Sequence, residues 1–263
     1  NGMTATDLVA DAPGSYAAGL GSSLALADRV GDAPLSTANS LSFNMTPENR
    51  ISYAAGYAPT QADNIYSMNF DGASDYINAG SSLGLIGTEV RTFSVWLKTS
   101  QTGLQTVLGT RDVNTNGWVI QIELNSILFY NVLGGGNKGI YTTAANLTDG
   151  NWHHLAIVRA GSANNKIYVD GVSQTLDTNT FGAENLTDPQ SSKDLVIGAS
   201  HNTGGTFYRF FNGKIDELAI FDYALSARQI KQDIYNATTT GKTADLNNNS
   251  NLTPPVAWYR MGD

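Results

Sequence analysis

The chain has 263 residues, of which 41% are hydrophobic and 14% charged, and its formal net charge is −8 at pH 7. Its 15 Lys and Arg residues form no run, which argues against nucleic acid as a partner, because phosphate binding needs clustered basic side chains. There is no cysteine, so no disulfide stabilises the fold. No apolar run is long enough to span a bilayer. A single all-β domain of this size is ordinary.

Residues 1–63 are rich in Ala, Gly, Ser, Asp and Pro and show no sustained hydrophobic periodicity. Three interpretations are open: an extended arm that docks on a neighbouring subunit, an irregular layer over the following domain, or a disordered tail. We expect an ordered arm, because the many apolar residues disfavour complete disorder.

From Ile65 to Ile220 the sequence predicts β-structure throughout. The segment Thr92–Lys98 alternates, and each of its faces carries an aromatic side chain, which predicts a central strand. Farther along, Trp118–Leu124 and Ile127–Val132 flank Asn125-Ser126, which predicts a hairpin with a two-residue turn.

A second hairpin is predicted from Trp152–Arg159 and the strand beginning at Lys166. Strand alternation places the adjacent His153 and His154 on opposite faces, so the pair cannot hold one metal ion together. We expect one of them to be buried beside Trp152 and hydrogen-bonded, and the other to lie at the surface.

One helix is predicted, over Ser226–Tyr235, with Ser226 as its N-cap and with Ile230 and Ile234 recurring at helical spacing. A polar, Asn-rich linker follows. The chain then ends in the apolar segment Val256–Met261, which predicts a terminal strand.

Several motifs follow one another in a characteristic order. They are Met68–Ile77, Thr92–Lys98, Asp149–Gly171, Leu195–Ala199 and Phe211–Phe221. This ordered set, from about Asn64 to Tyr235, resembles the laminin-G-like (concanavalin A-like lectin/glucanase) jelly-roll family. The resemblance implies an all-β fold, a two-sheet antiparallel jelly-roll sandwich with an N-terminal arm and one short C-terminal helix. We therefore divide the chain into an arm at residues 1–63, a jelly roll at 64–237, and a linker with a terminal strand at 238–263.

A strand like Val256–Met261 opens the jelly roll in the family, whereas here it comes last. Three alternatives follow. The strand completes its own sandwich, it is donated to a neighbouring copy, or it begins a further domain. Donation would make the protein a homo-oligomer, because an open sheet edge is a template for pairing.

The resemblance also implies a structural calcium ion, held by the Asp at the start of the last strand. That position is Asp216 here, with Asp71 and Asp75 as companions; carboxylates are the oxygen ligands that calcium prefers. The alternative interpretation is that Asp71 and Asp75 only cap turns.

Enzymatic relatives with this fold carry a Glu-x-Asp-x-x-Glu triplet or lyase motifs that are missing from this sequence. We therefore expect no catalysis. Sugar binding needs an exposed aromatic ring and nearby polar groups, and the candidates are Trp118, Tyr208 and Phe210, although such rings are usually core residues in a sandwich. We expect a non-catalytic recognition or adhesion module that binds a glycan or a surface protein on a cell or virion exterior. The alternative is a structural fibre, capsid-decoration or filament subunit assembled through its arm and terminal strand.

Overall fold

The chain divides into two units, residues 1–61 and residues 62–263. The computed structural model describes parts of the second unit only, namely residues 66–80, 90–111, 117–124, 126–133, 136–143, 145–161, 164–177, 193–202, 205–238 and 245–261. The predicted arm at 1–63 therefore lies outside the described residues.

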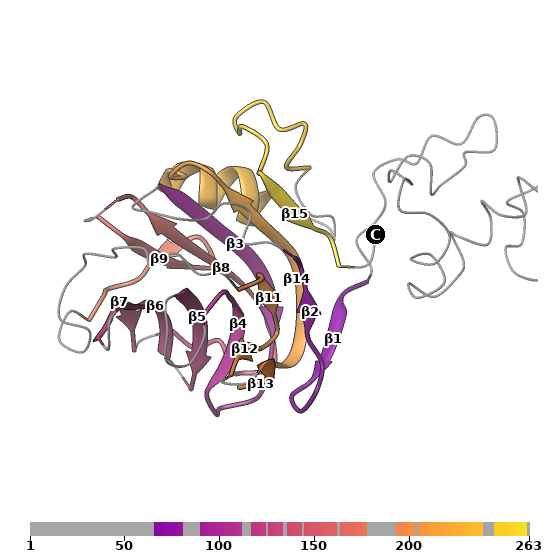
Figure 1. The fold of residues 1–263 in the computed structure, drawn as a ribbon. Coiled ribbons are helices and arrows are strands. Elements are labelled where there is room, and N and C mark those ends of the chain that lie inside the picture. Colours follow the sequence, from indigo (N-terminus) through magenta and orange to yellow (C-terminus); the bar gives the residue numbers. More distant parts are fainter. Residues whose placement is uncertain are drawn as a thin grey trace, which may run out of the picture. The chain divides into compact units, whose positions relative to one another are not determined.

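Two antiparallel sheets stack to form a β-sandwich, which confirms the predicted all-β fold (Figure 1). The seven-stranded sheet has the order β1-β14-β3-β8-β9-β10, with β15 also paired to β14. Its strands are β1 (Met68–Asp71), β3 (Arg91–Lys98), β8 (Trp152–Arg159), β9 (Lys166–Val169), β10 (Val172–Ser173), β14 (Asn212–Phe221) and β15 (Ala257–Tyr259). The predicted central strand is β3, which lies between β14 and β8.

The second sheet has six strands in the order β2-β11-β4-β5-β6-β7. They are β2 (Ile77–Asn78), β4 (Gln105–Gly109), β5 (Gly117–Glu123), β6 (Ser126–Leu133), β7 (Gly136–Thr142) and β11 (Val196–Ile197). A separate two-stranded hairpin consists of β12 (Ser200–His201) and β13 (Phe207–Tyr208).

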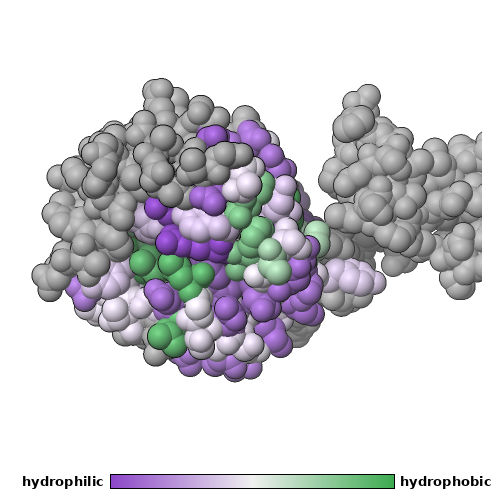
Figure 2. Space-filling model, turned by 60° about the horizontal axis from the view of Figure 1, so that its bottom comes forward, coloured by the Kyte–Doolittle hydropathy of each residue, from purple (hydrophilic) through white to green (hydrophobic). Residues whose placement is uncertain are grey.

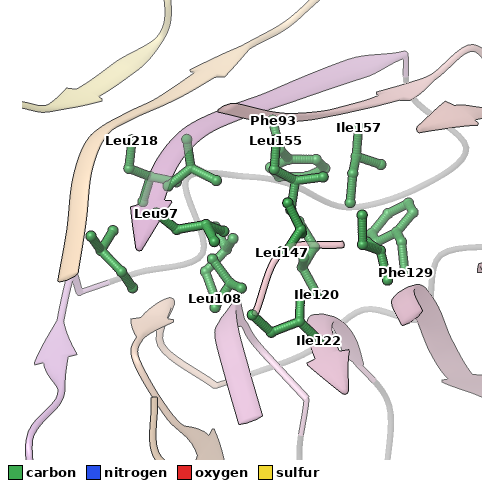
Figure 3. Close-up of a cluster of buried hydrophobic side chains, with 14 of the residues drawn as sticks. Phe93, Leu97, Leu108, Ile120, Ile122, Phe129, Leu147, Leu155, Ile157 and Leu218 are labelled. Carbon is green, nitrogen blue, oxygen red and sulfur yellow. The ribbon is translucent and has the colours of Figure 1, made fainter. Parts of the chain in front are cut away.

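The main hydrophobic core lies between the two sheets (Figure 3). Because side chains alternate along a strand, β3 turns Phe93 and Leu97 inward, and β5 turns Ile120 and Ile122 inward to meet them. Strand β8 likewise turns Leu155 and Ile157 inward. The period-two pattern of the sequence therefore defines the core.

A second apolar layer covers the outer face of the seven-stranded sheet. Ile230 and Ile234 of the π-helix η2 (Gln229–Tyr235) pack in one cluster with Val158 and Phe221, and the 3₁₀ turn η3 (Asn236–Thr238) follows. The predicted helix and its apolar spacing are thus confirmed. No helix in the described part of the chain is long and apolar enough to cross a membrane.

The start of the helical segment is fixed by a reciprocal capping box. The backbone N–H of Gln229 donates to Ser226 Oγ (3.2 Å), and the backbone N–H of Ser226 donates to Gln229 Oε1 (3.0 Å). Ser226 is therefore the capping residue that the sequence predicted.

The β5–β6 hairpin differs from the prediction by one residue. Glu123 pairs with Ser126, so Ser126 belongs to strand β6 and Leu124 belongs to the turn. Leu124 has a φ of 50°, the positive φ that the first central position of a tight hairpin turn requires. Leucine disfavours a positive φ, but with Leu124 in this position the two strands keep their apolar side chains on the same face.

The terminal strand β15 pairs with the chain's own β14, with Leu218 opposite Tyr259 and Ile220 opposite Ala257. Strand β1 occupies the other half of the same β14 edge. The indole Nε1–H of Trp258 donates to the buried Glu217 carboxylate (2.6 Å). Within this chain the terminal strand therefore completes its own sandwich.

Candidate ligand-binding site

The outer face of the six-stranded sheet is polar at its centre yet withdrawn from solvent. Strand β5 turns Trp118 and Ile120 into the core, so Val119 and Gln121 point to the outer face, together with Tyr130 of β6. Gln121 is 0% exposed and Tyr130 is 5% exposed. Seen from this side, strongly hydrophilic residues lie directly beside a group of hydrophobic ones (Figure 2).

Gln121 is the centre of a hydrogen-bonded network on this face. Its Nε2 donates to Thr106 Oγ1 (3.0 Å), and its Oε1 accepts from the Tyr130 hydroxyl (2.8 Å). Thr106 in turn shares a hydrogen bond with Ser200 (2.8 Å). Because an unpaired buried amide is costly, this network fixes Gln121 and holds the Tyr130 hydroxyl in place.

Two arginines meet at that hydroxyl. Arg111 Nη1 donates to Tyr130 OH (3.1 Å) and to Tyr208 OH (2.9 Å). Arg209 Nη1 donates to Tyr130 OH (3.4 Å) and to Gln121 Oε1 (3.3 Å). The guanidinium of Arg111 also lies over the Tyr130 ring, and that of Arg209 over the Tyr208 ring, at 5.3 and 4.9 Å. We call these five residues the arginine–tyrosine cluster.

Arg209 reaches the cluster through an unusual backbone conformation. Its φ is 54°, in the left-handed region that costs a non-glycine residue roughly 1–2 kcal/mol. Its carbonyl accepts from the Thr106 N–H (2.9 Å), beside the bulge in β4 between Thr106 and Leu108. Bulges often re-aim side chains near sites, and here the bulge and the β12–β13 hairpin together place Arg209 over the sheet.

The cluster carries positive charge that no described carboxylate neutralises. Neither Arg111 nor Arg209 forms an ion pair or a hydrogen bond with an acidic side chain in the described part of the chain. The Nε of Arg111 is buried without a hydrogen-bond partner. The cluster is therefore a positively charged patch on a protein whose net charge is −8.

The predicted aromatic residues have three different positions. Tyr208 belongs to the cluster and is half-buried. Trp118 is 3% exposed and packs between Phe93 and Phe129 in the core, so the prediction that it stacks on a sugar is wrong for this arrangement. Phe210 is half-buried beside Arg209 in the chain, and its role stays a prediction.

Sequence reasoning missed Arg111, Gln121, Tyr130 and Arg209. One signal was present: Gln121 is a polar residue between two isoleucines of a buried strand. Such a position needs hydrogen-bond partners, so Gln121 marked this face of β5 as polar.

The three predicted calcium ligands do not form one group. The Asp71 carboxylate accepts hydrogen bonds from the backbone N–H groups of Ser74, Ala73 and Asp75, which hold its pKa well below the usual range. Asp216 is buried on β14, and its carboxylate accepts from the Glu217 N–H.

Strand register separates these carboxylates. Asp71 lies opposite Asn212, and Asp216 is farther along β14 by about 13 Å at the rise of an extended strand. No group of three His, Cys, Asp or Glu side chains that could hold a metal occurs among the described residues. Asp71 thus has the turn-capping role of the alternative interpretation, its companion Asp75 accepts from the Asp71 N–H (3.0 Å), and calcium stays a prediction.

The adjacent histidines have different environments. His154 is 0% exposed, its Nε2 shares a hydrogen bond with Ser94 Oγ (2.9 Å), and burial lowers its pKa to about 4. Its aromatic neighbours are Trp96 and Tyr235 rather than the expected Trp152, which is 38% exposed. The prediction of one buried, hydrogen-bonded histidine is confirmed.

His153 is not free at the surface, because it is held between two carboxylates. Its Nδ1 lies 2.8 Å from Asp170 and its Nε2 lies 3.0 Å from Asp149. Burial alone would lower the pKa of His153, but the hydrogen bonds to both aspartates outweigh it and raise the pKa. Both histidines therefore have structural partners.

Comparison with known proteins identifies the fold. A family model described as the concanavalin A-like lectin/glucanases superfamily matches residues 71–231, more than half of the chain. No curated protein sequence matches.

Three solved structures with this fold illustrate its range. A putative carbohydrate-binding protein from Bacteroides ovatus aligns with a TM-score of 0.50 and 19% identity, over 75% of this chain and 52% of that one. A SAP-like pentraxin from Limulus polyphemus aligns with a TM-score of 0.42 and 15% identity, over 63% and 79%. Domains LG4-5 of the mouse laminin α1 chain align with a TM-score of 0.43 and 16% identity, over 68% and 44%. The chain thus spans about half or less of two of these three, and the likeness concerns the fold alone.

Proposed function

Because the chain belongs to the laminin-G-like group of the concanavalin A-like lectin/glucanases superfamily, we propose that it is a non-catalytic recognition module that binds a glycan at a cell or virion surface. The glycan binds at the arginine–tyrosine cluster on the outer face of the six-stranded sheet. The observation that carries the proposal is this cluster, in which the two guanidinium groups are held in place by neutral acceptors and have no acidic partner among the described residues.

The chemistry of the cluster suits a sugar. Planar guanidinium groups and a tyrosine hydroxyl can hydrogen-bond to ring hydroxyls, and half-buried aromatic and apolar surface packs against the C–H faces of a pyranose. The partly buried Leu128 packs against Tyr130 and Val119 and supplies apolar surface directly beside the cluster. Polar and apolar groups are therefore adjacent, as sugar recognition requires.

The distribution of carboxylates supports binding rather than hydrolysis. Glycosidases need two carboxylates on either side of the scissile bond. On β5, Glu123 is exposed at the hairpin end and lies outside the cluster, to which no described carboxylate belongs. Asp216 and Glu217 lie on the other sheet, where Glu217 bonds Trp258 and Arg260.

The proposal is tested by screening the protein on a glycan array and measuring the affinity of the bound glycans by calorimetry. Replacing Tyr208 with Phe removes the hydroxyl that accepts from Arg111, and we expect about a tenfold loss of affinity, the effect of one hydrogen bond of ordinary strength. Tyr223→Phe is the matched control, because its hydroxyl bonds Thr253 on the far side of the molecule. Absence of any glycan ligand, or equal losses in both variants, would overturn the proposal.

The structural-subunit alternative rests on the arm at residues 1–63, which lies outside the described residues, and on a terminal strand available for donation, whereas β15 is paired with the chain's own β14.

A further inference from the structure

We infer that the glycan is acidic, and that a carboxylate or sulfate group of one sugar unit binds between Arg111 and Arg209. The inference rests on the proposed function, because it names the class of ligand for the same site. Its basis is the charge of the cluster and the hydrogen-bonding groups that the two arginines leave unused.

The first step is the charge. Both guanidinium groups donate to one hydroxyl oxygen, that of Tyr130, so two positive charges are held close together. Like charges at this range repel, and the repulsion is strongest where the surroundings are withdrawn from water. Tyr130 is 5% exposed. An anion placed between the two arginines removes the repulsion, whereas a neutral sugar does not.

The second step is the contrast with other arginines. Arg228 pairs with Asp233 (3.1 Å) and Arg260 pairs with Glu217 (3.4 Å), both on the side of the seven-stranded sheet. Arg111 and Arg209 have only neutral acceptors in the described part of the chain. Among the described residues, Arg111 and Arg209 thus differ from Arg228 and Arg260, whose charges are paired with carboxylates.

The third step is geometry. Only Nη1 of each arginine donates to described residues, which leaves Nη2 of both groups for a ligand. Arg111 Nε has no hydrogen-bond partner but is buried, so the ligand meets Nη2 of this group. A guanidinium presents paired N–H groups that match the two oxygens of a carboxylate or sulfate. The surrounding structure holds Arg209 at a φ of 54°, since its carbonyl accepts from the Thr106 N–H.

The choice of an acidic glycan over a nucleic acid follows from the remaining charge. The protein carries a net charge of −8, which repels a polyanion that must track along a surface. One carboxylate or sulfate on a sugar unit needs only the two arginines.

The experiment uses a glycan array that presents uronic-acid and sulfated oligosaccharides, each beside its carboxyl-reduced or desulfated counterpart. We expect the bound glycans to be acidic and their neutralised counterparts to bind at least about tenfold more weakly, since charge-assisted hydrogen bonds are lost. The carboxylate and sulfate arms show which oxyanion is preferred. Binding of neutral glycans, or retention of binding after neutralisation, would contradict the inference while leaving the proposed function intact. No glycan binding at all would remove both.

Variants then locate the acid group. Arg111→Gln and Arg209→Gln should each weaken binding of the acidic glycan by about tenfold or more, and Arg228→Gln, whose native partner is Asp233, should not. A measurement that needs no variant is the salt dependence of the wild-type protein: affinity for the acidic glycan should fall as NaCl is raised to about 0.3 M. Wild-type affinity in both arginine variants, or affinity that does not respond to salt, would show that the acid group binds elsewhere.

Discussion

The outer faces of the two sheets are used in opposite ways. On the seven-stranded sheet the chain covers its own surface: η2 and the segment around Leu246 bury an apolar cluster, and Glu217 is paired with Trp258 and Arg260. On the six-stranded sheet the arginine–tyrosine cluster is fixed from below by Gln121 but has no counter-ion among the described residues. A face that the chain covers itself supports stability, and a face whose arginines have no described counter-ion offers a site for a ligand. The comparison predicts that substitutions on the first change unfolding and substitutions on the second change binding.

The largest effect is expected for Phe221→Ala on the covered face. Phe221 is 0% exposed within the apolar cluster beneath η2, and truncating a buried Phe leaves a cavity that costs about 3–5 kcal/mol. Urea unfolding measures the loss. Val172→Ala is the control, because Val172 is 56% exposed and should change the free energy of unfolding by less than about 0.5 kcal/mol. A small effect of Phe221→Ala would mean that the helix does not hold this face.

The two histidines predict a maximum of stability near pH 6.5. Burial holds the pKa of His154 at about 4 in the folded protein, against 6.5 when unfolded. The unfolded chain therefore takes up a proton first as the pH falls, and stability declines between pH 6.5 and 4 by up to about 3 kcal/mol. Asp149, with a pKa of about 2, does not contribute in this window, because an unfolded Asp titrates only near 3.8.

His153 determines how the stability changes above pH 6.5. Its pKa is raised above 6.5 by the hydrogen bonds to Asp170 and Asp149, which outweigh burial, so its stabilisation is complete below pH 6.5 and is lost as the pH rises through the raised pKa. Urea unfolding between about pH 4.5 and pH 8 measures both the acid limb and the alkaline limb of the stability curve, that is, its declines below and above pH 6.5. His154→Gln should flatten the acid limb and His153→Gln the alkaline limb; an unchanged acid limb in His154→Gln would exclude His154 as its cause.

A smaller effect is expected for Trp258→Phe. The substitution keeps most of the ring but removes the Nε1–H that donates to the buried Glu217 carboxylate, and hydrogen bonds to charged groups contribute about 1.5–3 kcal/mol. Trp152→Phe is the matched control at an exposed tryptophan. If Trp258→Phe unfolds like the wild type, β15 does not dock on its own sandwich in solution, and donation of the strand to a neighbouring copy returns as a hypothesis.

The smallest effect separates backbone strain from side-chain function at Arg209. Arg209→Gly and Arg209→Ala both remove the guanidinium, but only glycine adopts a φ of 54° without strain. The glycine variant should be more stable than the alanine variant by about 1 kcal/mol in thermal or urea unfolding, while both lose ligand affinity equally. Equal stabilities would show that the positive φ relaxes when the side chain is gone.

Much of the fold was predictable from local patterns. The period-two alternation of Phe93 and Leu97 identified the central strand. Ser226, with Ile230 and Ile234 at helical spacing, identified the helix. Alternation also places Trp118 on the same face as Ile120, so its burial followed from a pattern already visible. These features depend on neighbours in the sequence.

The candidate site was not predictable in the same way. Arg111 and Arg209 are distant in the chain, and they meet only because the β12–β13 hairpin returns to the bulge at Thr106. No local pattern encodes that contact, nor the positive φ of Arg209. The buried Gln121 indicated a polar face but not which residues complete it. Long-range pairing, rather than propensity, assembles the cluster.

The most direct test of the central claim is a side-chain NMR titration with the acidic oligosaccharide that binds most tightly. The unpaired Nε–H of Arg111 and the amide of Gln121 report on one face, and the indole Nε1–H of Trp258 reports on the other. We predict that the resonances of Arg111 and Gln121 shift and saturate while that of Trp258 stays constant. A saturating shift at Trp258, with Arg111 and Gln121 unchanged, would contradict the assignment of ligand binding to the six-stranded sheet.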